Sequence, residues 1–288
     1  MKNCTNHKIN ISPLISIGMP VYNGEQFIEE SLNSILNQSF TNFELIISDN
    51  NSTDKTKYIC EKYASKDARI TYVRQEKNIG AARNFIYVFN NRKQAEYFIW
   101  AACDDSWSEN WLELLISNFE DNDCGLFGRY IEGQSQSARC PESFLKYQFI
   151  KYFIAKDVSG KCYYSYALFK TDVLIKSDME LMNISIGADQ IYLLNLLQFG
   201  NLRFIDGCVF KYRVHDGSEA SRQSKNYGTI KRVLVSHFPM NYYVGAIRAV
   251  PGKFKLLILF LIPVKYFYEQ FPKWVMVGKK LFQYLTVR

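Results

Sequence analysis

The sequence lacks the short motifs that mark common cofactor sites. Only three of its 288 residues are histidines, and no H-E-x-x-H is present, which argues against a zinc hydrolase. No G-x-G-x-x-G and no G-x-x-x-x-G-K-[ST] occurs, so the usual fingerprints of dinucleotide and P-loop sites are missing. The seven cysteines form no C-x-x-C pair and no signal peptide precedes them. We therefore expect reduced thiols in a cytoplasmic protein rather than a disulfide framework.

Long apolar runs are also lacking. Leu256–Val264 is only nine residues long, contains Pro263 and is flanked by lysines, whereas a membrane-spanning helix needs about 20 residues. Acidic residues are scarce in the same part of the chain, because residues 226–288 hold ten Lys/Arg and one Glu. The net charge of +7 of the whole chain therefore comes from this segment. Such a basic, aromatic tail is typical of helices that lie at an anionic membrane surface. A helical cap that packs on the protein core remains the alternative, and nucleic acid is not favoured because no known binding module accompanies the charge.

What the first part of the chain does contain is a regular alternation. Apolar runs that read as buried strands alternate with helical patterns, with short connections between them; the runs are Leu14–Met19, Phe43–Ile47, Ile70–Val73 and Tyr97–Ala101. This order predicts an α/β fold with a parallel or mixed sheet flanked by helices. In such sheets ligands bind beyond the carboxyl ends of the strands. The unusual polar clusters all follow strands there: Tyr22-Asn23, Asp49-Asn50, Asn78–Gly80 and Asp104-Asp105. Their convergence favours a binding site over separate solvated turns.

The paired carboxylates Asp104 and Asp105 follow the fourth predicted strand directly. Burying such a pair without partners is costly. Carboxylate oxygens suit a hard divalent cation whose shell is completed by a ligand diphosphate. A solvated turn that caps the next helix is the structural alternative.

Several motifs together resemble one enzyme family. They are Pro20–Asn23, Gln38–Phe40, Glu44–Asp54, Asn78–Gly80 with Arg83-Asn84, and Asp104-Asp105. In this order and spacing, over about residues 15 to 111, they are similar to the family 2 inverting glycosyltransferases, of the bacterial surface-polysaccharide type. The resemblance implies a GT-A fold, which is a Rossmann-like nucleotide-binding sheet flanked by helices, here with a basic helical tail.

The resemblance also implies roles in binding a nucleotide sugar. Asp49 would bond to the base, Pro20 and Tyr22 would shape the base pocket, and Arg83 would lie near the base or the diphosphate. Asn78 belongs to the same set.

The metal motif is only partly present. The resemblance implies that Asp104 is the metal-binding carboxylate of a D-x-D motif. Asp105, beside it, would contact the nucleotide sugar. The sequence departs from the family where Ala102 replaces the first Asp of that motif. This departure puts the sugar identity in doubt more than the metal.

Two later segments extend the resemblance. Asp189 precedes an apolar helix, where the family carries the base that deprotonates the acceptor hydroxyl; an ordinary helix cap is the alternative reading. Tyr212-Arg213-Val214-His215 resembles the segment that folds over the diphosphate. His215 would ligate the metal or bond to the phosphate, and Arg213 would neutralise charge on the leaving group.

The remaining elements are predicted from pattern alone. We expect helices over Trp111–Phe119 and Pro141–Phe153, with Thr171 capping a short helix. We expect strands over Gly125–Arg129, Tyr163–Lys170 and Leu202–Ile205, after which Val209–Val214 leads into His215. The predicted division is a nucleotide-sugar half (residues 1–110), an acceptor and catalytic half (111–225) and the tail (226–288).

The sequence therefore predicts a metal-dependent inverting glycosyltransferase of hexosyltransferase type. Its donor would be a UDP- or dTDP-sugar, its cofactor Mn²⁺ or Mg²⁺, and its acceptor a glycan or lipid-linked glycan of O-antigen, capsule or related polysaccharide. It would lie in the cytoplasm, peripherally at the inner face of the membrane. The alternatives are a non-catalytic, membrane-docked nucleotide-sugar or glycan binder, and a nucleotidyltransferase. The latter would need a Gly- and Lys/Arg-rich loop after the first strand, which Met19–Gly24 lacks.

Overall fold

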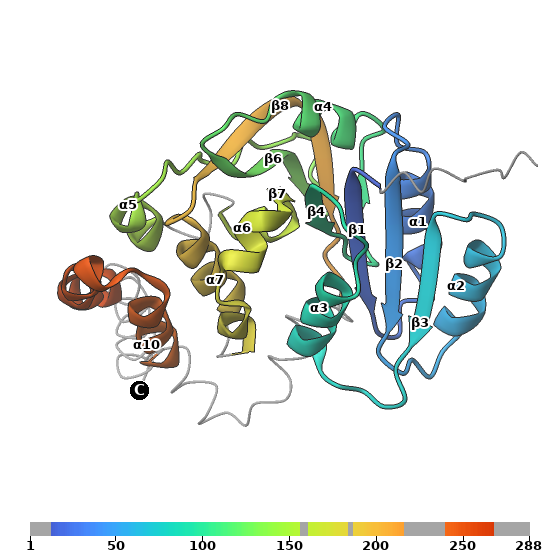
Figure 1. Cartoon of the computed structure of the whole chain (residues 1–288), viewed down its shortest axis with the longest axis horizontal. Helices are drawn as coiled ribbons and strands as arrows, with labels where there is room; N and C mark the ends of the chain where they lie inside the picture. The colour runs from blue at the N-terminus through green and yellow to red at the C-terminus, as the bar shows by residue number, and fades with distance from the viewer. Residues whose placement is uncertain (1–12, 156–160, 184–186, 216–239, 268–288) are drawn as a thin grey trace, which may run out of the picture.

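The computed structural model describes residues 13–155, 161–183, 187–215 and 240–267 (Figure 1). The strands are β1 (Ile15–Val21), β2 (Phe43–Asp49), β3 (Ile70–Arg74), β4 (Tyr97–Trp100), β5 (Ser106–Trp107), β6 (Asp123–Glu132), β7 (Leu168–Lys170) and β8 (Asn201–Tyr212). The helices are α1 (Ile28–Leu36), α2 (Thr56–Ala64), α3 (Ala81–Asn90), α4 (Trp111–Ser117), α5 (Phe149–Ile154), α6 (Thr171–Lys176), α7 (Ala188–Leu196), α10 (Met240–Ala249) and a further helix over residues 252–267. Two 3₁₀ helices are η2 (Lys161–Tyr166) and η3 (Met179–Asn183).

The eight strands form one mixed sheet in the order β3-β2-β1-β4-β7-β6-β8-β5. β1 to β4 are parallel, as the alternation of strands and helices predicts. β7 is antiparallel to both β4 and β6, whereas β6 and β8 are parallel. The mixed α/β fold expected from the sequence is confirmed. One sheet also runs through both of the halves that the sequence predicts, so their division stays a prediction.

β1 and β2 are buried over their whole length because helices cover the sheet (Figure 1). α3 packs on β1 so closely that a Cβ at Gly18 would lie 2.6 Å from Val88 of α3, and it would also lie 2.7 Å from Phe98 of β4. α1 buries Ile28, Leu32 and Ile35, the apolar face that its sequence spacing predicts.

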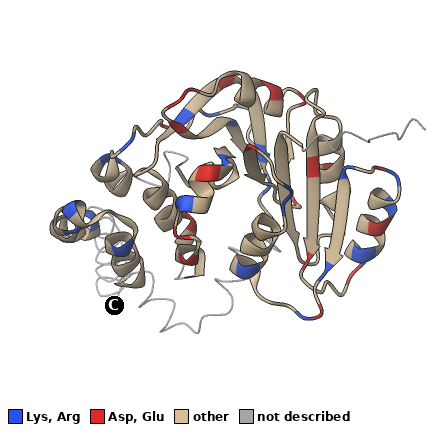
Figure 2. Cartoon of the chain, in the orientation of Figure 1, with Lys and Arg blue, Asp and Glu red and all other residues tan. Residues whose placement is uncertain are grey.

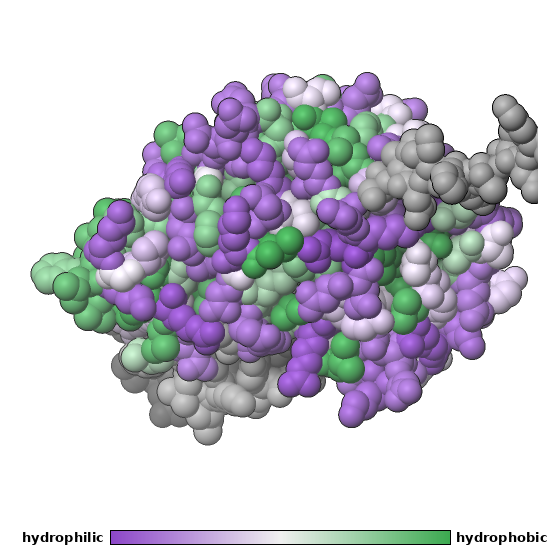
Figure 3. All heavy atoms as spheres, viewed as in Figure 1, coloured by the Kyte–Doolittle hydropathy of each residue, from purple (hydrophilic) through white to green (hydrophobic). Residues whose placement is uncertain are grey.

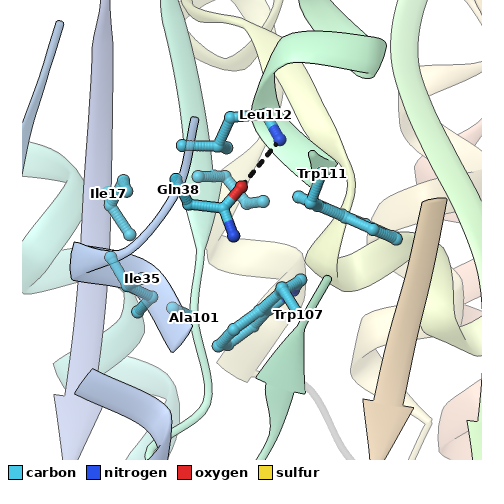
Figure 4. A pocket seen from close by; sticks show the side chains of 8 residues that line it. Ile17, Ile35, Gln38, Ala101, Trp107, Trp111 and Leu112 are labelled. Carbon is cyan, nitrogen blue, oxygen red and sulfur yellow. Dashed lines mark hydrogen bonds between the residues drawn. The ribbon is translucent and has the colours of Figure 1, made fainter. Parts of the chain in front are cut away.

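Gln38 joins the end of α1 to the segment after β5. Its side-chain amide donates to the carbonyls of Ser34 (2.9 Å) and Ser108 (2.8 Å) and accepts from the Leu112 N–H (3.0 Å). Figure 4 shows Gln38 beside a small apolar cavity of about 10 Å³, which is at the limit for one water molecule and too small for a ligand. Gln38, one of the residues that carry the resemblance, therefore has a structural role.

The second half differs from the sequence prediction in four places. The strand predicted over Tyr163–Lys170 is wrong in its first part, which belongs to the 3₁₀ helix η2. Only Leu168–Lys170 forms a strand, β7, which pairs with β4 and β6. The helix expected over Pro141–Phe153 forms only at Phe149–Ile154. Thr171 begins α6 and makes no cap bond with its side chain.

The fourth difference concerns the last strand. The strand expected at 202–205 is longer than predicted: β8 continues through Gly207, at φ +97°, to Tyr212. Its pairing with β6 shifts register there, as in a β-bulge.

The chain reaches the far edge of the sheet directly after β4. β5 follows β4 in sequence but pairs antiparallel with β8, at Ser106–Lys211 and Trp107–Phe210. The five residues from Ala101 to Asp105 therefore link a central strand to an edge strand.

Among the described residues, no helix is both long and apolar enough to cross a membrane.

Candidate active site

The loops after β1 and β2 are tied together by polar contacts. Asn23, at φ +53°, donates its N–H to the Ser52 hydroxyl (2.9 Å) and accepts from the Thr53 N–H (2.9 Å). The Gly24 N–H donates to the Thr56 hydroxyl (2.8 Å). The predicted pocket residues adjoin this fixed loop: Pro20 is buried near the end of β1, and Tyr22, which is half-buried, follows the strand directly.

The predicted base-binding residue Asp49 ends β2, and its side chain is fully buried (0% exposed). One carboxylate oxygen accepts the Ser52 N–H (2.8 Å) and the other accepts the Tyr72 hydroxyl (2.8 Å). Arg74 lies 3.6 Å from the second oxygen and also donates to the Ser52 carbonyl (2.8 Å). Burial and then the bond to Asp49 raise the pKa of Tyr72 above its ordinary value, so Tyr72 stays a donor.

Tyr72 and Arg74 were missed by the sequence reasoning. They lie on β3 at alternate positions, and their register beside β2 brings Arg74 opposite Asp49. A period-two pattern of polar side chains at the end of β3 was the only available signal.

The loop after β3 is fixed by two asparagines. The Asn78 side-chain oxygen accepts from the Asn50 amide (3.1 Å) and from the Gly80 N–H (2.9 Å), and the Asn50 oxygen accepts the Ile79 N–H (2.7 Å). Gly80 has φ +88°, a conformation that glycine adopts without strain. The predicted residue Arg83 follows in the first turn of α3 and is exposed.

The Asp104-Asp105 turn is held by the segment that follows β8. Asp105 is buried, and one of its oxygens accepts the Arg213 N–H (2.8 Å). The Arg213 side chain donates to the Asp104 carbonyl (2.9 Å) and pairs with Glu30 of α1. Burial and then the neighbouring Asp104 charge raise the pKa of Asp105 well above its ordinary value. Asp105 therefore has the surroundings of a residue that organises the loop, and its predicted contact with the donor stays a prediction.

Asp104 and His215 lie together, as the resemblance implies for two residues of one metal or phosphate site. The His215 Nε2 atom is 2.9 Å from the Asp104 carboxylate. Phe27, which the sequence reasoning missed, contacts both partners of this turn: its ring lies 4.6 Å from the His215 ring and 4.6 Å from the Arg213 guanidinium. In the part of the chain that the structure describes, no group of three or more His, Cys, Asp or Glu side chains could hold a metal.

Asp189 is exposed in the first turn of α7. The helix begins after Gly187, which is at φ +78° and has no side chain to cap it, and Asp189 follows at the second position of the helix. A carboxylate in the first turn is favoured by the helix dipole.

Tyr166, at the end of η2, was also missed by the sequence reasoning. Its ring stacks on Phe210 at 5.4 Å. Burial raises the pKa of the Tyr166 hydroxyl well above its ordinary value. The charges of Asp105, Asp104 and Asp189 raise the pKa of Tyr166 further, so this ring is within electrostatic reach of both the Asp104-Asp105 turn and α7. The aromatic residues of the second half carry no motif by which Tyr166 could have been found.

Comparison with known proteins gives one family. The model of glycosyl transferase family 2 matches residues 16–177, which is more than half of the chain. TuaG of Bacillus subtilis strain 168, whose name assigns it to teichuronic acid biosynthesis, is 37% identical over 117 residues, which are 40% of this chain and 45% of TuaG. An uncharacterized glycosyltransferase of Haemophilus influenzae is 32% identical over 133 residues, which are 46% of this chain and 38% of that protein. The matched region thus spans less than half the length of these relatives.

Solved structures share the fold. Staphylococcus aureus TarS 1-349 in complex with UDP-GlcNAc is 18% identical, with a TM-score of 0.61 over 88% of this chain and 72% of that one. The mannosyltransferase PcManGT of Pyrobaculum calidifontis, in complex with GDP-Man and Mn²⁺, is 16% identical, with a TM-score of 0.57 over 86% of this chain and 69% of that one. The expected GT-A-like fold is confirmed by these similarities.

Proposed function

Because the chain belongs to glycosyl transferase family 2, we propose that it transfers a sugar from a nucleoside-diphosphate sugar to an acceptor hydroxyl. The observation that carries this proposal is the clustering of Asp104, Arg213 and His215 at the carboxyl ends of the parallel strands. Ligands bind at this edge in open α/β sheets. The donors bound by the structural relatives, UDP-GlcNAc and GDP-Man, support a nucleotide sugar as the ligand class.

The nucleotide base would bind in the pocket of Pro20 and Tyr22, with Asn78 and Arg83 at its rim and Asp49 as the base acceptor. Tyr72 and Arg74 cover the Asp49 carboxylate. The Tyr72 bond is short, whereas the Arg74 contact is 3.6 Å long and Arg74 is one-third exposed. A base N–H that bonds to Asp49 would therefore displace Arg74 rather than Tyr72. UDP and dTDP both present such an N–H.

Asp104 and His215 would hold a Mn²⁺ or Mg²⁺ ion together with the diphosphate. Their donor set of one carboxylate and one imidazole suits a manganese-type ion that keeps positions open for phosphate oxygens. When bound, the cation supplies positive charge against the diphosphate. Arg213 would add a second, permanent positive charge at the same place. Asp105 would hold the Arg213 backbone in position.

Asp189 would act as the general base. Its carboxylate takes the proton from the acceptor hydroxyl, and the oxygen forms a bond to the anomeric carbon as the bond to the diphosphate breaks. The nucleoside diphosphate leaves with the bonding electrons from the opposite face. This single displacement inverts the configuration at the anomeric carbon.

The acceptor would be a lipid-linked glycan in the assembly of a bacterial surface polysaccharide. The similarity to TuaG supports this class of pathway. The basic tail supports a place at the inner face of the cytoplasmic membrane, where such acceptors are found.

The test of donor binding is a thermal melt of the protein with UDP, dTDP, GDP and CDP, each with and without Mn²⁺. A ligand at 100 times its dissociation constant adds about 2.7 kcal/mol to the unfolding free energy if it binds only the folded state. We expect the largest shift for UDP or dTDP with Mn²⁺, and we expect Asp104→Ala to lose the part that depends on Mn²⁺. If no nucleotide raises the melting temperature, the proposed chemistry is wrong although the fold stands.

The test of catalysis is a transfer assay on a lipid-linked acceptor, with the anomeric configuration of the product read by NMR. An inverted product is expected. A protein that binds the donor but gives no turnover with any acceptor, and whose Asp189→Asn variant behaves identically, would be the non-catalytic binder instead.

A further inference from the structure

The helix over residues 252–267 is apolar all round in its central part. Every residue from Leu256 to Val264 is apolar. One side of the helix packs on the protein: Ile258 is fully buried, and the Phe254 ring lies 4.8 Å from that of Phe149 in α5. Near its end, the buried Lys265 ammonium donates to the Phe153 carbonyl (2.6 Å). The helix is therefore fixed to the body of the protein along one side.

The opposite side of this helix is exposed. Leu256 is 78% and Phe260 83% exposed, and Leu259 and Val264 are each more than half exposed. Their spacing of three and four residues puts them on one surface, which we call the apolar face. Figure 3 shows hydrophobic residues gathered at the end of the molecule where this helix lies in Figure 1. A helix that is apolar all round is normally buried, and contiguous exposed apolar patches mark interaction sites.

The charge around the apolar face indicates what covers it. Lys253 and Lys255 are exposed in the first turn, and no acidic residue lies between Gly252 and Phe267 (Figure 2). A second copy of the chain would bring two segments of like charge together, which is unfavourable. An anionic lipid surface satisfies both features, since lysines meet the headgroups while leucine and phenylalanine side chains enter the acyl boundary.

We propose that the apolar face of helix 252–267 docks the protein onto an anionic membrane. This inference rests on the proposed function, because a membrane contact serves transfer to a lipid-linked acceptor. It adds the surface that makes the contact.

The docking helix is connected to the helix that carries Asp189. Helix 252–267 follows α10 after two residues, and α10 packs against α7. The Asn195 amide of α7 donates to the Ala249 carbonyl at the end of α10 (2.7 Å). The two helices approach so closely that a Cβ at Gly245 would lie 2.7 Å from Ile191. Docking would therefore orient α7, and with it Asp189, relative to the bilayer that holds a lipid-linked acceptor.

The experiment is co-sedimentation of the whole chain with phosphatidylcholine vesicles that contain or lack phosphatidylglycerol. We expect binding to the anionic vesicles and a loss of at least about tenfold in the Leu256→Glu/Phe260→Glu variant. Ile175→Glu, which places the same charge at an exposed apolar residue of α6, is the matched control and should bind as the unaltered protein does. Unchanged binding of the double variant, or no binding by the unaltered protein, would refute the proposal.

A second variant removes charge without touching the apolar face. Lys253→Glu/Lys255→Glu should weaken binding to anionic vesicles by at least about tenfold. Size measurement and thermal melts identify other occupants. If the unaltered protein is a dimer that Leu256→Glu/Phe260→Glu dissociates, a second copy covers the face; if that variant melts at a much lower temperature, the rest of this chain covers it. Either result overturns the proposal.

Nucleotide binding separates this inference from the proposed function. All of these variants should keep the UDP-dependent rise in melting temperature. A protein that binds vesicles but no nucleotide would leave the docking surface intact and would contradict only the proposed transfer activity.

Discussion

The two halves of the sheet are held together by different interactions. We call the half with β1, β2 and β3 the donor side and the half with β6, β8 and η2 the aromatic or acceptor side. On the donor side, asparagine, serine and aspartate side chains hydrogen-bond the loops after β1, β2 and β3 to one another; the Asn50 oxygen, for example, accepts the Ile79 N–H (2.7 Å). The same kind of bond ties α3 to β2, where the Asn84 amide donates to the Ser48 carbonyl. On the side of β6, β8 and η2, aromatic rings pack on one another instead. Phe127 contacts Trp111 at 5.1 Å and Phe210 at 5.4 Å.

This difference explains why the two sides can be recognised unequally in a sequence. A buried hydrogen bond to a backbone group needs one residue type at one position, because leaving its partner unsatisfied is costly. Packed aromatic rings tolerate other large apolar residues of similar volume. The donor side can therefore be recognised in the sequence by its motifs, whereas the acceptor side cannot.

The largest expected effect is on the acceptor side, at Asp189. Asp189→Asn should lower turnover about a hundredfold to ten-thousandfold, because an amide cannot take the acceptor proton. The nucleotide affinity should be unchanged, since the donor site lies on the other side. Asp172→Asn, in the first turn of α6, is the matched control. Steady-state kinetics and nucleotide titration measure both quantities, and unchanged turnover in Asp189→Asn would remove the base assignment.

The aromatic side is tested by Phe127→Ala. Phe127 is fully buried, so its truncation should lower the unfolding free energy by about 3 to 5 kcal/mol. The folded fraction should still bind the nucleotide as before, because the contacts of Phe127 lie outside the donor loops. Urea unfolding and nucleotide titration provide the readouts, with the half-exposed Ile150→Ala as control. A parallel loss of nucleotide affinity would show that the two sides are not independent.

The donor side is tested by Asn84→Ala. Asn84 donates to the Ser48 carbonyl (2.8 Å) and accepts from the Ser48 hydroxyl (2.6 Å) in a buried position. Losing both bonds should cost about 1 to 3 kcal/mol of unfolding free energy. The nucleotide affinity should fall as well, because Ser48 precedes Asp49. Asn91→Ala, which removes an exposed bond at the end of the same helix, should change neither quantity appreciably. If Asn84→Ala keeps the full nucleotide affinity, the polar ties do not shape the donor pocket.

The smallest effect is expected at Asp67, just before β3 and away from the loops that follow the strands. Arg69 donates to both oxygens of Asp67 (3.0 and 2.7 Å), and these bonds hold the pKa of Asp67 below its ordinary value of 3.8. A carboxyl with a lowered pKa stabilises the fold above its ordinary pKa, and this stability is lost as the pH falls through the folded value. Asp67→Asn should therefore cost less than about 1 kcal/mol at neutral pH and nothing in strong acid. Urea unfolding at both pH values measures the difference, and a cost that persists in acid would rule out the charge as its cause.

The sequence predicted the parallel strands well because their burial on both faces leaves a local signal. The apolar runs that end at Met19, Ile47, Val73 and Ala101 correspond to β1 to β4 within two residues at each end. The polar clusters after them do lie at one sheet edge, and Asp104, Arg213 and His215 are brought together as the resemblance implies.

The second half was predicted less well because its strands depend on partners distant in sequence. Tyr163–Tyr166 has the aromatic composition of a strand but forms η2, because its rings pack on β6 and β8. β5 is two residues long and exists only through its pairing with β8. The roles of Tyr72 and Arg74 likewise depend on the register of β3 beside β2.

The link between β4 and β5 has a consequence for how the protein can change. Because β4 lies in the centre of the sheet and β5 pairs at its edge, the residues from Ala101 to Asp105 are fixed at both ends. An insertion or deletion there would shift the register of Ser106-Trp107 by one position and turn each side chain to the opposite face. Residue type at this link can vary, as Ala102 shows in place of a family aspartate, but its length cannot. Homologous sequences that diverge freely in the loops of the second half should therefore keep the same number of residues between Trp100 and Ser106.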